Sequence, residues 1–157
     1  MSALTLVSDD AEMVVRSDLL GDLKVRSTDV LTFPVGMLGF PECRRFALLR
    51  GGRDGLFWLQ SMEYSALVFL LVDPFAIEHN YSFDVQPTQI AELGPGAASD
   101  IGLLAVVTLP ANQGQLPTVN LQGPLVINFK SRCAKQIVSG DDQHAVRRPL
   151  DLATLVA

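Results

Sequence analysis

The residue types that most often carry catalysis are few in this chain and stand apart. His79 and His144 are the only histidines, and Cys43 and Cys133 are the only cysteines. No CxxC pair is present, and neither histidine has a second metal-ligand residue at the spacing of a zinc site. We therefore expect no metal centre, and we interpret both cysteines as reduced thiols of a cytoplasmic protein.

Carboxylates and glycine-rich loops do not suggest an active site either. Asp9 and Asp10 are adjacent, as are Asp141 and Asp142, and adjacent acidic residues on an exposed segment usually point apart and stay solvated. Neither a GxxxxGK[ST] motif nor a strand-linked GxGxxG motif is present to hold a phosphate. These absences predict a protein that is not an enzyme and has no cofactor.

Charge is unevenly distributed along the chain. Twelve Lys and Arg against 17 Asp and Glu give a net charge of −5, so nucleic acid is not an expected partner. Residues 54–129 contain no Lys or Arg at all. The carboxylates of this stretch are Asp54, Glu63, Asp73, Glu78, Asp84, Glu92 and Asp100. Two interpretations remain open: a solvated surface whose acids pair with bases from the rest of the chain, or an acidic face that attracts a basic protein partner.

The elements that must position these residues belong to one domain. A chain of 157 residues with 48% apolar residues is typical of a single globular unit. We expect a domain over residues 13–150, a flexible acidic segment over 1–12 and a tail over 151–157. The longest purely apolar run, residues 66–72, is too short to cross a bilayer, and the N-terminus has no basic leader. The sequence thus predicts no membrane association, and we expect a monomer.

Short apolar runs between turn residues predict an all-β fold. The alternation of Tyr81, Phe83 and Val85 with polar residues indicates a half-buried strand, and Pro87 and Gly94 bound a short helix over residues 88–93. The ranges expected as strands are 13–16, 22–26, 29–33, 46–50, 56–61, 66–72, 81–86, 101–109, 125–129 and 136–138. The first three are expected to form a meander. About nine or ten short strands favour an antiparallel barrel-like fold or a sandwich, with one or two short helices.

Three stretches are more particular than a generic β protein requires. The segment FPVGMLGFP, residues 33–41, combines two prolines and two glycines in a rigid turn that presents apolar side chains. The second stretch runs from FWLQS at 57–61 to VDP at 72–74, and the third is PTVNLQGPLVIN at 117–128.

In this order and spacing the three stretches resemble the FliW family of flagellar assembly factors, from about Met13 to Pro149. The resemblance implies a cytoplasmic, non-enzymatic β-barrel-like protein that binds the translational regulator CsrA and also binds flagellin. Exchange between these partners would couple the flagellin level to flagellin translation. Gly123 and His144 depart from the family pattern, and the N-terminal segment lies outside it.

Candidate partner-binding residues follow from the turn, the acidic stretch and the third motif. They are Met37, Leu38, Phe40, Glu63, Asp73, Glu78, Asp84, Asn120 and Asn128. The first three are candidates for the flagellin contact, and the four carboxylates for a basic partner surface. Asn120 and Asn128 either cap loops through their own side chains or take part in recognition. A small-ligand-binding β-barrel remains the alternative function.

Overall fold

The computed structural model describes residues 11–139 and 144–155, which form ten strands and six short 3-10 turns. The strands are β1 (Glu12–Ser17), β2 (Gly21–Arg26), β3 (Val30–Thr32), β4 (Arg45–Arg50), β5 (Leu56–Ser61), β6 (Val68–Val72), β7 (Ile101–Thr108), β8 (Thr118–Asn128), β9 (Cys133–Gln136) and β10 (Arg148–Pro149). The 3-10 turns are η1 (Ser27–Asp29), η2 (Pro74–Ala76), η3 (Pro87–Gln89), η4 (Ala91–Leu93), η5 (Ala98–Asp100) and η6 (Leu152–Thr154). No helix in the described ranges is both long and apolar enough to span a membrane.

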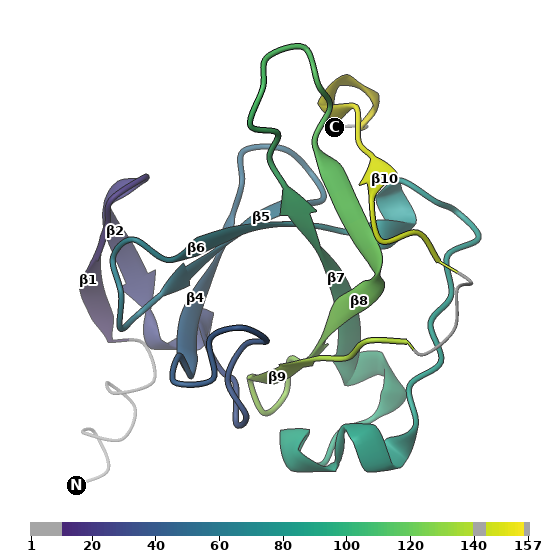
Figure 1. The fold of residues 1–157 in the computed structure, drawn as a ribbon. Coiled ribbons are helices and arrows are strands. Elements are labelled where there is room, and N and C mark those ends of the chain that lie inside the picture. The colour runs from purple at the N-terminus through teal and green to yellow at the C-terminus, as the bar shows by residue number, and fades with distance from the viewer. Residues whose placement is uncertain (1–10, 140–143, 156–157) are drawn as a thin grey trace, which may run out of the picture.

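Strands β3 to β9 form a closed barrel (Figure 1). The sheet order is β10-β8-β7-β6-β5-β4-β3-β9, and β8 also pairs with β9, which joins the two sides of the sheet. All pairings are antiparallel except that of β3 with β9. The prediction of an all-β, mostly antiparallel barrel is confirmed, and closure leaves few unpaired strand edges.

The barrel interior is packed with apolar side chains. Each of the seven barrel strands contributes at least one buried residue to a single cluster. These residues are Leu31, Phe46, Leu59, Leu71, Leu104, Leu125, Ile127 and Ala134. A small-ligand barrel would need this space to be open, so the packing weighs against that alternative function.

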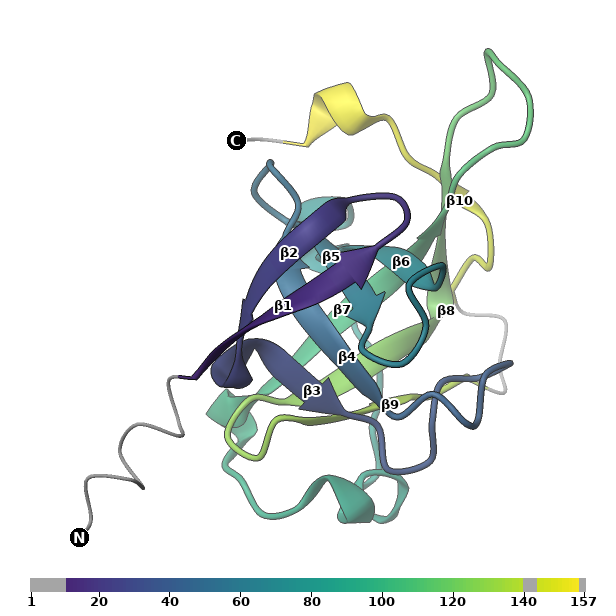
Figure 2. The same cartoon turned by 90° about the vertical axis from the view of Figure 1, so that its left-hand side faces the viewer.

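The β1–β2 hairpin lies outside the barrel. Its buried residues Val15 and Val25 pack with Ala47 of β4, and Figure 2 shows the hairpin crossing in front of the barrel strands. The hairpin itself was predicted, but the expected three-stranded meander is wrong, because β3 pairs with β4 and β9 instead of β2. The turn η1 redirects the chain between β2 and β3, and the Ser27 amide donates to the Ala11 carbonyl.

Two local predictions between β6 and β7 are wrong. Residues 81–86 alternate between buried or half-buried and exposed as expected, yet they form no strand. The alternation reports one-sided packing: Tyr81 is buried and donates its hydroxyl to the Leu121 carbonyl at 2.8 Å. Residues 88–93 form parts of two 3-10 turns and no α-helix, because so short a segment between Pro87 and Gly94 gains little from helix propagation.

Strand β8 is longer than predicted and irregular. The sequence suggested a start at Leu125, but the strand begins at Thr118. Its pairing with β7 jumps from Leu104↔Leu125 to Val106↔Asn120, so the residues between form a bulge. A bulge tolerates Gly123 and Pro124 inside a strand, so the strand continues through two residues that are uncommon in regular strands.

Candidate partner-binding surface

The turn over residues 33–41 is closed by backbone hydrogen bonds and by one glycine. The Gly36 amide donates to the Phe33 carbonyl at 2.9 Å, and the Phe40 amide donates to the Met37 carbonyl at 2.8 Å. Gly36 has a φ of 73°, and a Cβ atom there would lie 2.4 Å from the Pro41 carbonyl oxygen. No other residue type fits this position, so Gly36 fixes the path that presents the tip of the turn.

A chain of aromatic contacts links this turn to the barrel core. The Phe33 and Phe46 ring centroids are 5.1 Å apart, those of Phe46 and Phe69 are 6.1 Å apart, and those of Phe69 and Phe40 are 5.9 Å apart. Phe33 and Phe46 are fully buried, while Phe40 is 37% exposed. The chain therefore anchors a partly exposed aromatic ring rigidly to the core.

Phe40 lines a shallow apolar pocket of about 360 Å³ together with residues just before β4 and residues of the loop after β5. The other lining residues are Glu42, Cys43, Tyr64, Ala66 and Leu67. Tyr64 is 51% exposed, and Leu38, at the tip of the turn, is 55% exposed. We call Leu38, Phe40, Tyr64 and Leu67 the aromatic patch.

Burial raises the pKa of the Cys43 thiol, with smaller contributions from the charges of Glu42 and Glu63, so this cysteine stays protonated and unreactive.

The loop that carries Tyr64 is held by two buried polar residues of β5. The Gln60 side-chain amide donates to the carbonyls of Ser61, Tyr64 and Ser65 at 3.1 to 3.4 Å. The Ser61 hydroxyl accepts from the amides of Glu63 and Tyr64. The LQS motif is thus structural, since it fixes the loop beside Phe40.

The candidate carboxylates lie in two separate regions. Glu63 is beside the aromatic patch, where it pairs with Arg45 at 3.6 Å. Asp73, Glu78 and Asp84 lie on the segment between β6 and β7. Asp73 accepts from the Phe75 amide at 2.9 Å, and Glu78 pairs with Arg148 at 3.3 Å. Asp84 is exposed.

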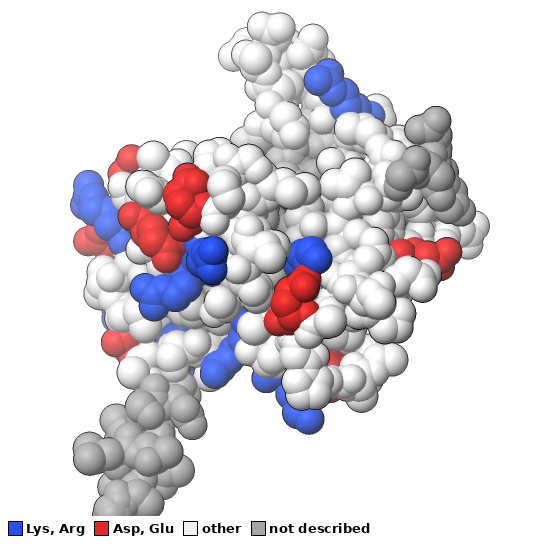
Figure 3. All heavy atoms as spheres, turned by 60° about the horizontal axis from the view of Figure 1, so that its bottom comes forward, with Lys and Arg blue, Asp and Glu red and all other residues white. Residues whose placement is uncertain are grey.

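The structure supports pairing of acids with bases from outside residues 54–129. Of the seven carboxylates in that stretch, Glu63, Glu78 and Glu92 form ion pairs, with Arg45, Arg148 and Lys135 respectively. Figure 3 shows acidic and basic side chains interspersed on one face of the molecule. The contact with Lys135 lowers the pKa of Glu92. The acidic region left without ion pairs among the described residues is therefore smaller than the sequence suggests.

Three candidate residues have structural roles. Met37 is 3% exposed and belongs to the barrel core. Asn128 is fully buried, donates to the carbonyls of Leu93, Gly94 and Pro95 at 3.3 Å, and accepts from the amides of Lys130 and Ser131. Asn120 accepts from the amides of Gln122 and Gly123 at 3.0 Å and so stabilises the β8 bulge. These bonds favour the loop-capping interpretation of both asparagines.

His79 lies on the segment between β6 and β7, and His144 contacts the same segment. His144 packs against Tyr81 and Phe83, with ring centroids 4.7 and 6.3 Å away. Within residues 11–139 and 144–155, no group of three or more His, Cys, Asp or Glu side chains could hold a metal ion.

Sequence reasoning identified Leu38 and Phe40 but missed Tyr64, Leu67 and Glu42. Tyr64 carries the one signal that could have been noticed, because an aromatic residue between Glu63 and Ser65 is unusual in a polar turn. Its proximity to Phe40 has no local signal, since the two residues are on different loops.

Comparison with known proteins identifies relatives over almost the whole domain. The model of the FliW protein family matches residues 14–150. A flagellar assembly factor FliW of Natranaerobius thermophilus is 33% identical over 139 residues, which are 88% of this chain and 92% of that protein. The one from Pseudothermotoga lettingae is 34% identical over 128 residues, 82% of each chain. A crystal structure of the flagellar assembly factor FliW superposes with a TM-score of 0.77 at 27% identity, covering 87% of this chain and 96% of that one. The chain therefore belongs to the FliW family.

Proposed function

We propose that this protein is a non-enzymatic flagellar assembly factor that acts in the cytoplasm as a monomer by binding CsrA and flagellin. Flagellin bound to it leaves CsrA free to repress flagellin translation, and export of flagellin releases the protein to bind CsrA. The observation that carries this proposal is the family match over residues 14–150, whose relatives are named flagellar assembly factors.

The aromatic patch is the proposed flagellin contact. An amphipathic segment needs an apolar groove to dock, and aromatic anchors in a shallow pocket dominate the energy of such contacts. The pocket beside Phe40 and the exposed Leu38 provide these features on a turn with a rigid backbone. Glu42 and Glu63 at its edge add polar groups for orientation.

The segment between β6 and β7 is the proposed contact for the basic partner CsrA. Asp73 and Asp84 form no ion pair among the described residues, and Glu78 is close to both in sequence. Unpaired surface carboxylates attract a basic protein at long range and raise its association rate. Met37 and Asn128 are left out of both proposed contacts because they are buried.

Isothermal titration with flagellin and with CsrA from a flagellated bacterium that encodes this protein tests the function and the two surfaces. L38S is expected to weaken flagellin binding about tenfold, because one apolar anchor is lost. L109S is the matched control, since Leu109 is also 55% exposed but directly follows β7, outside the aromatic patch. D84K is expected to weaken CsrA binding and flatten the salt dependence of its affinity, while D18K makes the same charge change on the β1–β2 hairpin and should do neither.

The outcomes separate the function from the surfaces. Failure of the unaltered protein to bind either partner would refute the proposed function. Normal binding by the unaltered protein, L38S and D84K alike would refute the surfaces and leave the function standing.

A further inference from the structure

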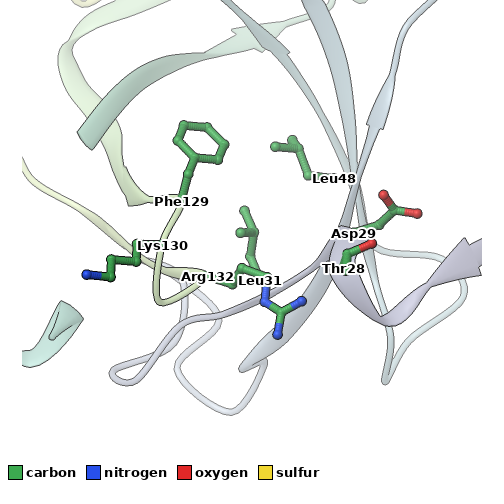
Figure 4. A pocket seen from close by; sticks show the side chains of 7 residues that line it. All are labelled: Thr28, Asp29, Leu31, Leu48, Phe129, Lys130 and Arg132. Atoms are coloured by element: carbon green, nitrogen blue, oxygen red, sulfur yellow. The ribbon is translucent and has the colours of Figure 1, made fainter. Parts of the chain in front are cut away.

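Two pockets of the molecule differ in the charged residues that line them. The first, of about 400 Å³, lies beside the pairing of β3 with β9, and Lys130 and Arg132 are among its lining residues. Figure 4 shows the side chains of Leu31, Leu48 and Phe129 directed into a common space, whereas the Lys130 side chain points away from it. The ammonium group of Lys130 therefore faces solvent and not the apolar interior of this pocket.

The second is the pocket beside Phe40, where Glu42 is the one charged lining residue. Among the described residues, Glu42 forms no ion pair. Its carboxylate has only a distant contact with the Cys43 thiol, whose Sγ lies 4.0 Å from Oε1. An ionised carboxylate accepts several hydrogen bonds, so Glu42 can still accept from a cationic group that enters the pocket.

Glu63 adds a second negative charge close to this pocket. One of its oxygens accepts from the Arg45 amide at 3.3 Å, and the other lies 3.6 Å from Arg45 Nε. Burial is the largest cause of the raised pKa of Cys43, and the charges of Glu42 and Glu63 add to it, which places both carboxylates near this lining residue. Neither Arg44 nor Arg45 lines the pocket. The pocket therefore has a negative electrostatic environment.

The apolar part of the pocket suits the side chain of a lysine or an arginine. Phe40 and Tyr64 are partly exposed, and aromatic faces attract cations. Ala66 and Leu67 offer apolar surface, on which the methylene stem of a lysine or an arginine packs while its charged end stays solvated. Because the Gln60 hydrogen bonds already fix the loop that carries Tyr64, little ordering is needed when a ligand enters.

We propose that this pocket receives a lysine or arginine side chain of the flagellin segment that docks on the aromatic patch. The methylene stem lies against Leu67 and Phe40, and the cation faces the Glu42 carboxylate. This inference rests on the proposed function and adds a charge requirement to it: the patch selects a segment in which a basic residue adjoins the apolar residue that contacts Leu38.

Methyl NMR with two small ions of equal chain length tests the pocket without flagellin. Hexylammonium chloride should shift the methyl signals of Ala66 and Leu67 at an about fivefold lower concentration than sodium hexanoate does. E42Q should reduce this preference to less than about twofold. D54N is the control, because Asp54 is an exposed carboxylate on the loop between β4 and β5 and forms no ion pair among the described residues. D54N should preserve the preference, so equal responses to the two ions, or equal losses in E42Q and D54N, would overturn the proposal.

Isothermal titration with flagellin at two salt concentrations tests the occupant. E42Q should weaken binding about fivefold and flatten its salt dependence, whereas L38S should weaken binding and keep the salt dependence. D54N should change neither. Normal binding by E42Q would overturn the charge requirement and leave the proposed function standing. Failure of the unaltered protein to bind flagellin would refute the proposed function and this occupant together, while the titration with small ions still decides whether the pocket binds a cation.

Discussion

At the scale of single residues, polar side chains fix the loops from within. Asn128 uses both ends of its amide to join the 93–95 turn to the start of the β8–β9 turn. Tyr81 does the same for the segment after β6, through its hydrogen bond to the Leu121 carbonyl. Such buried polar bonds contribute modestly when made, but they are costly to leave unpaired.

Tyr81 makes stability sensitive to alkaline pH. Burial, with a smaller contribution from the charge of Glu78, raises its pKa from 10.0 to about 12. Between these values the unfolded chain loses the proton while the folded protein keeps it. The free energy of unfolding therefore falls as pH rises from 10 towards 12, and the contribution is fully present below 10.

Urea unfolding of the unaltered protein and of Y81F at several pH values measures this contribution. The stability advantage of the unaltered protein over Y81F should shrink as pH passes 10. Y64F is the control, because Tyr64 is 51% exposed and its removal should not change the pH dependence. Parallel curves for all three proteins would contradict the assignment.

At the scale of elements, the turn over residues 33–41 determines whether Leu38 and Phe40 can be presented. Gly36 and Gly39 both have positive φ, 73° and 87°, but their surroundings differ. A Cβ atom at Gly36 would overlap the Pro41 carbonyl, whereas one at Gly39 would meet no atom within 4 Å. An alanine at Gly39 would therefore cause backbone strain alone, whereas an alanine at Gly36 would cause the same strain together with a steric overlap.

We expect G39A to cost about 1 kcal/mol of stability, the strain of a left-handed residue with a Cβ atom. G36A is expected to cost clearly more, above about 2 kcal/mol, because the turn must also shift away from Pro41. Chemical denaturation of both variants measures the difference. Equal losses would mean that the turn relaxes freely and does not hold the aromatic patch rigidly.

At the scale of the whole molecule, the barrel is closed unevenly. Strands β7 and β8 pair along nearly the full length of β7, but β3 and β9 share one register pair beside the pocket of Lys130 and Arg132. Few ladder bonds at the β3–β9 seam predict that it opens locally before the rest of the barrel.

Native-state hydrogen exchange should reveal this opening. The Thr32 amide, bonded to the Arg132 carbonyl, is expected to exchange at least about tenfold faster than the amide of Leu71, which lies on the central strand β6. Equal protection at Thr32 and Leu71 would indicate that the barrel opens only by global unfolding.

The sequence by itself determined the fold class, the hairpins and the family. Apolar runs bounded by glycine and proline identify strands because they report which faces avoid water, and the turn over residues 33–41 has a local steric cause in Gly36. The same local signals predicted a strand over residues 81–86, where none forms, and missed the start of β8. Alternating burial can occur in an irregular segment as well as in a strand, and a proline can lie inside a strand as well as at its end.

Only the tertiary structure decided which distant residues meet. Phe40 and Tyr64, Glu78 and Arg148, and the two sides of the β3–β9 seam come from segments far apart in the chain. Their contacts depend on how strands of similar apolar character are ordered around the barrel, and no single segment encodes that order. The same packing buries Met37 and Asn128, because side-chain exposure is set by neighbours that local sequence does not specify.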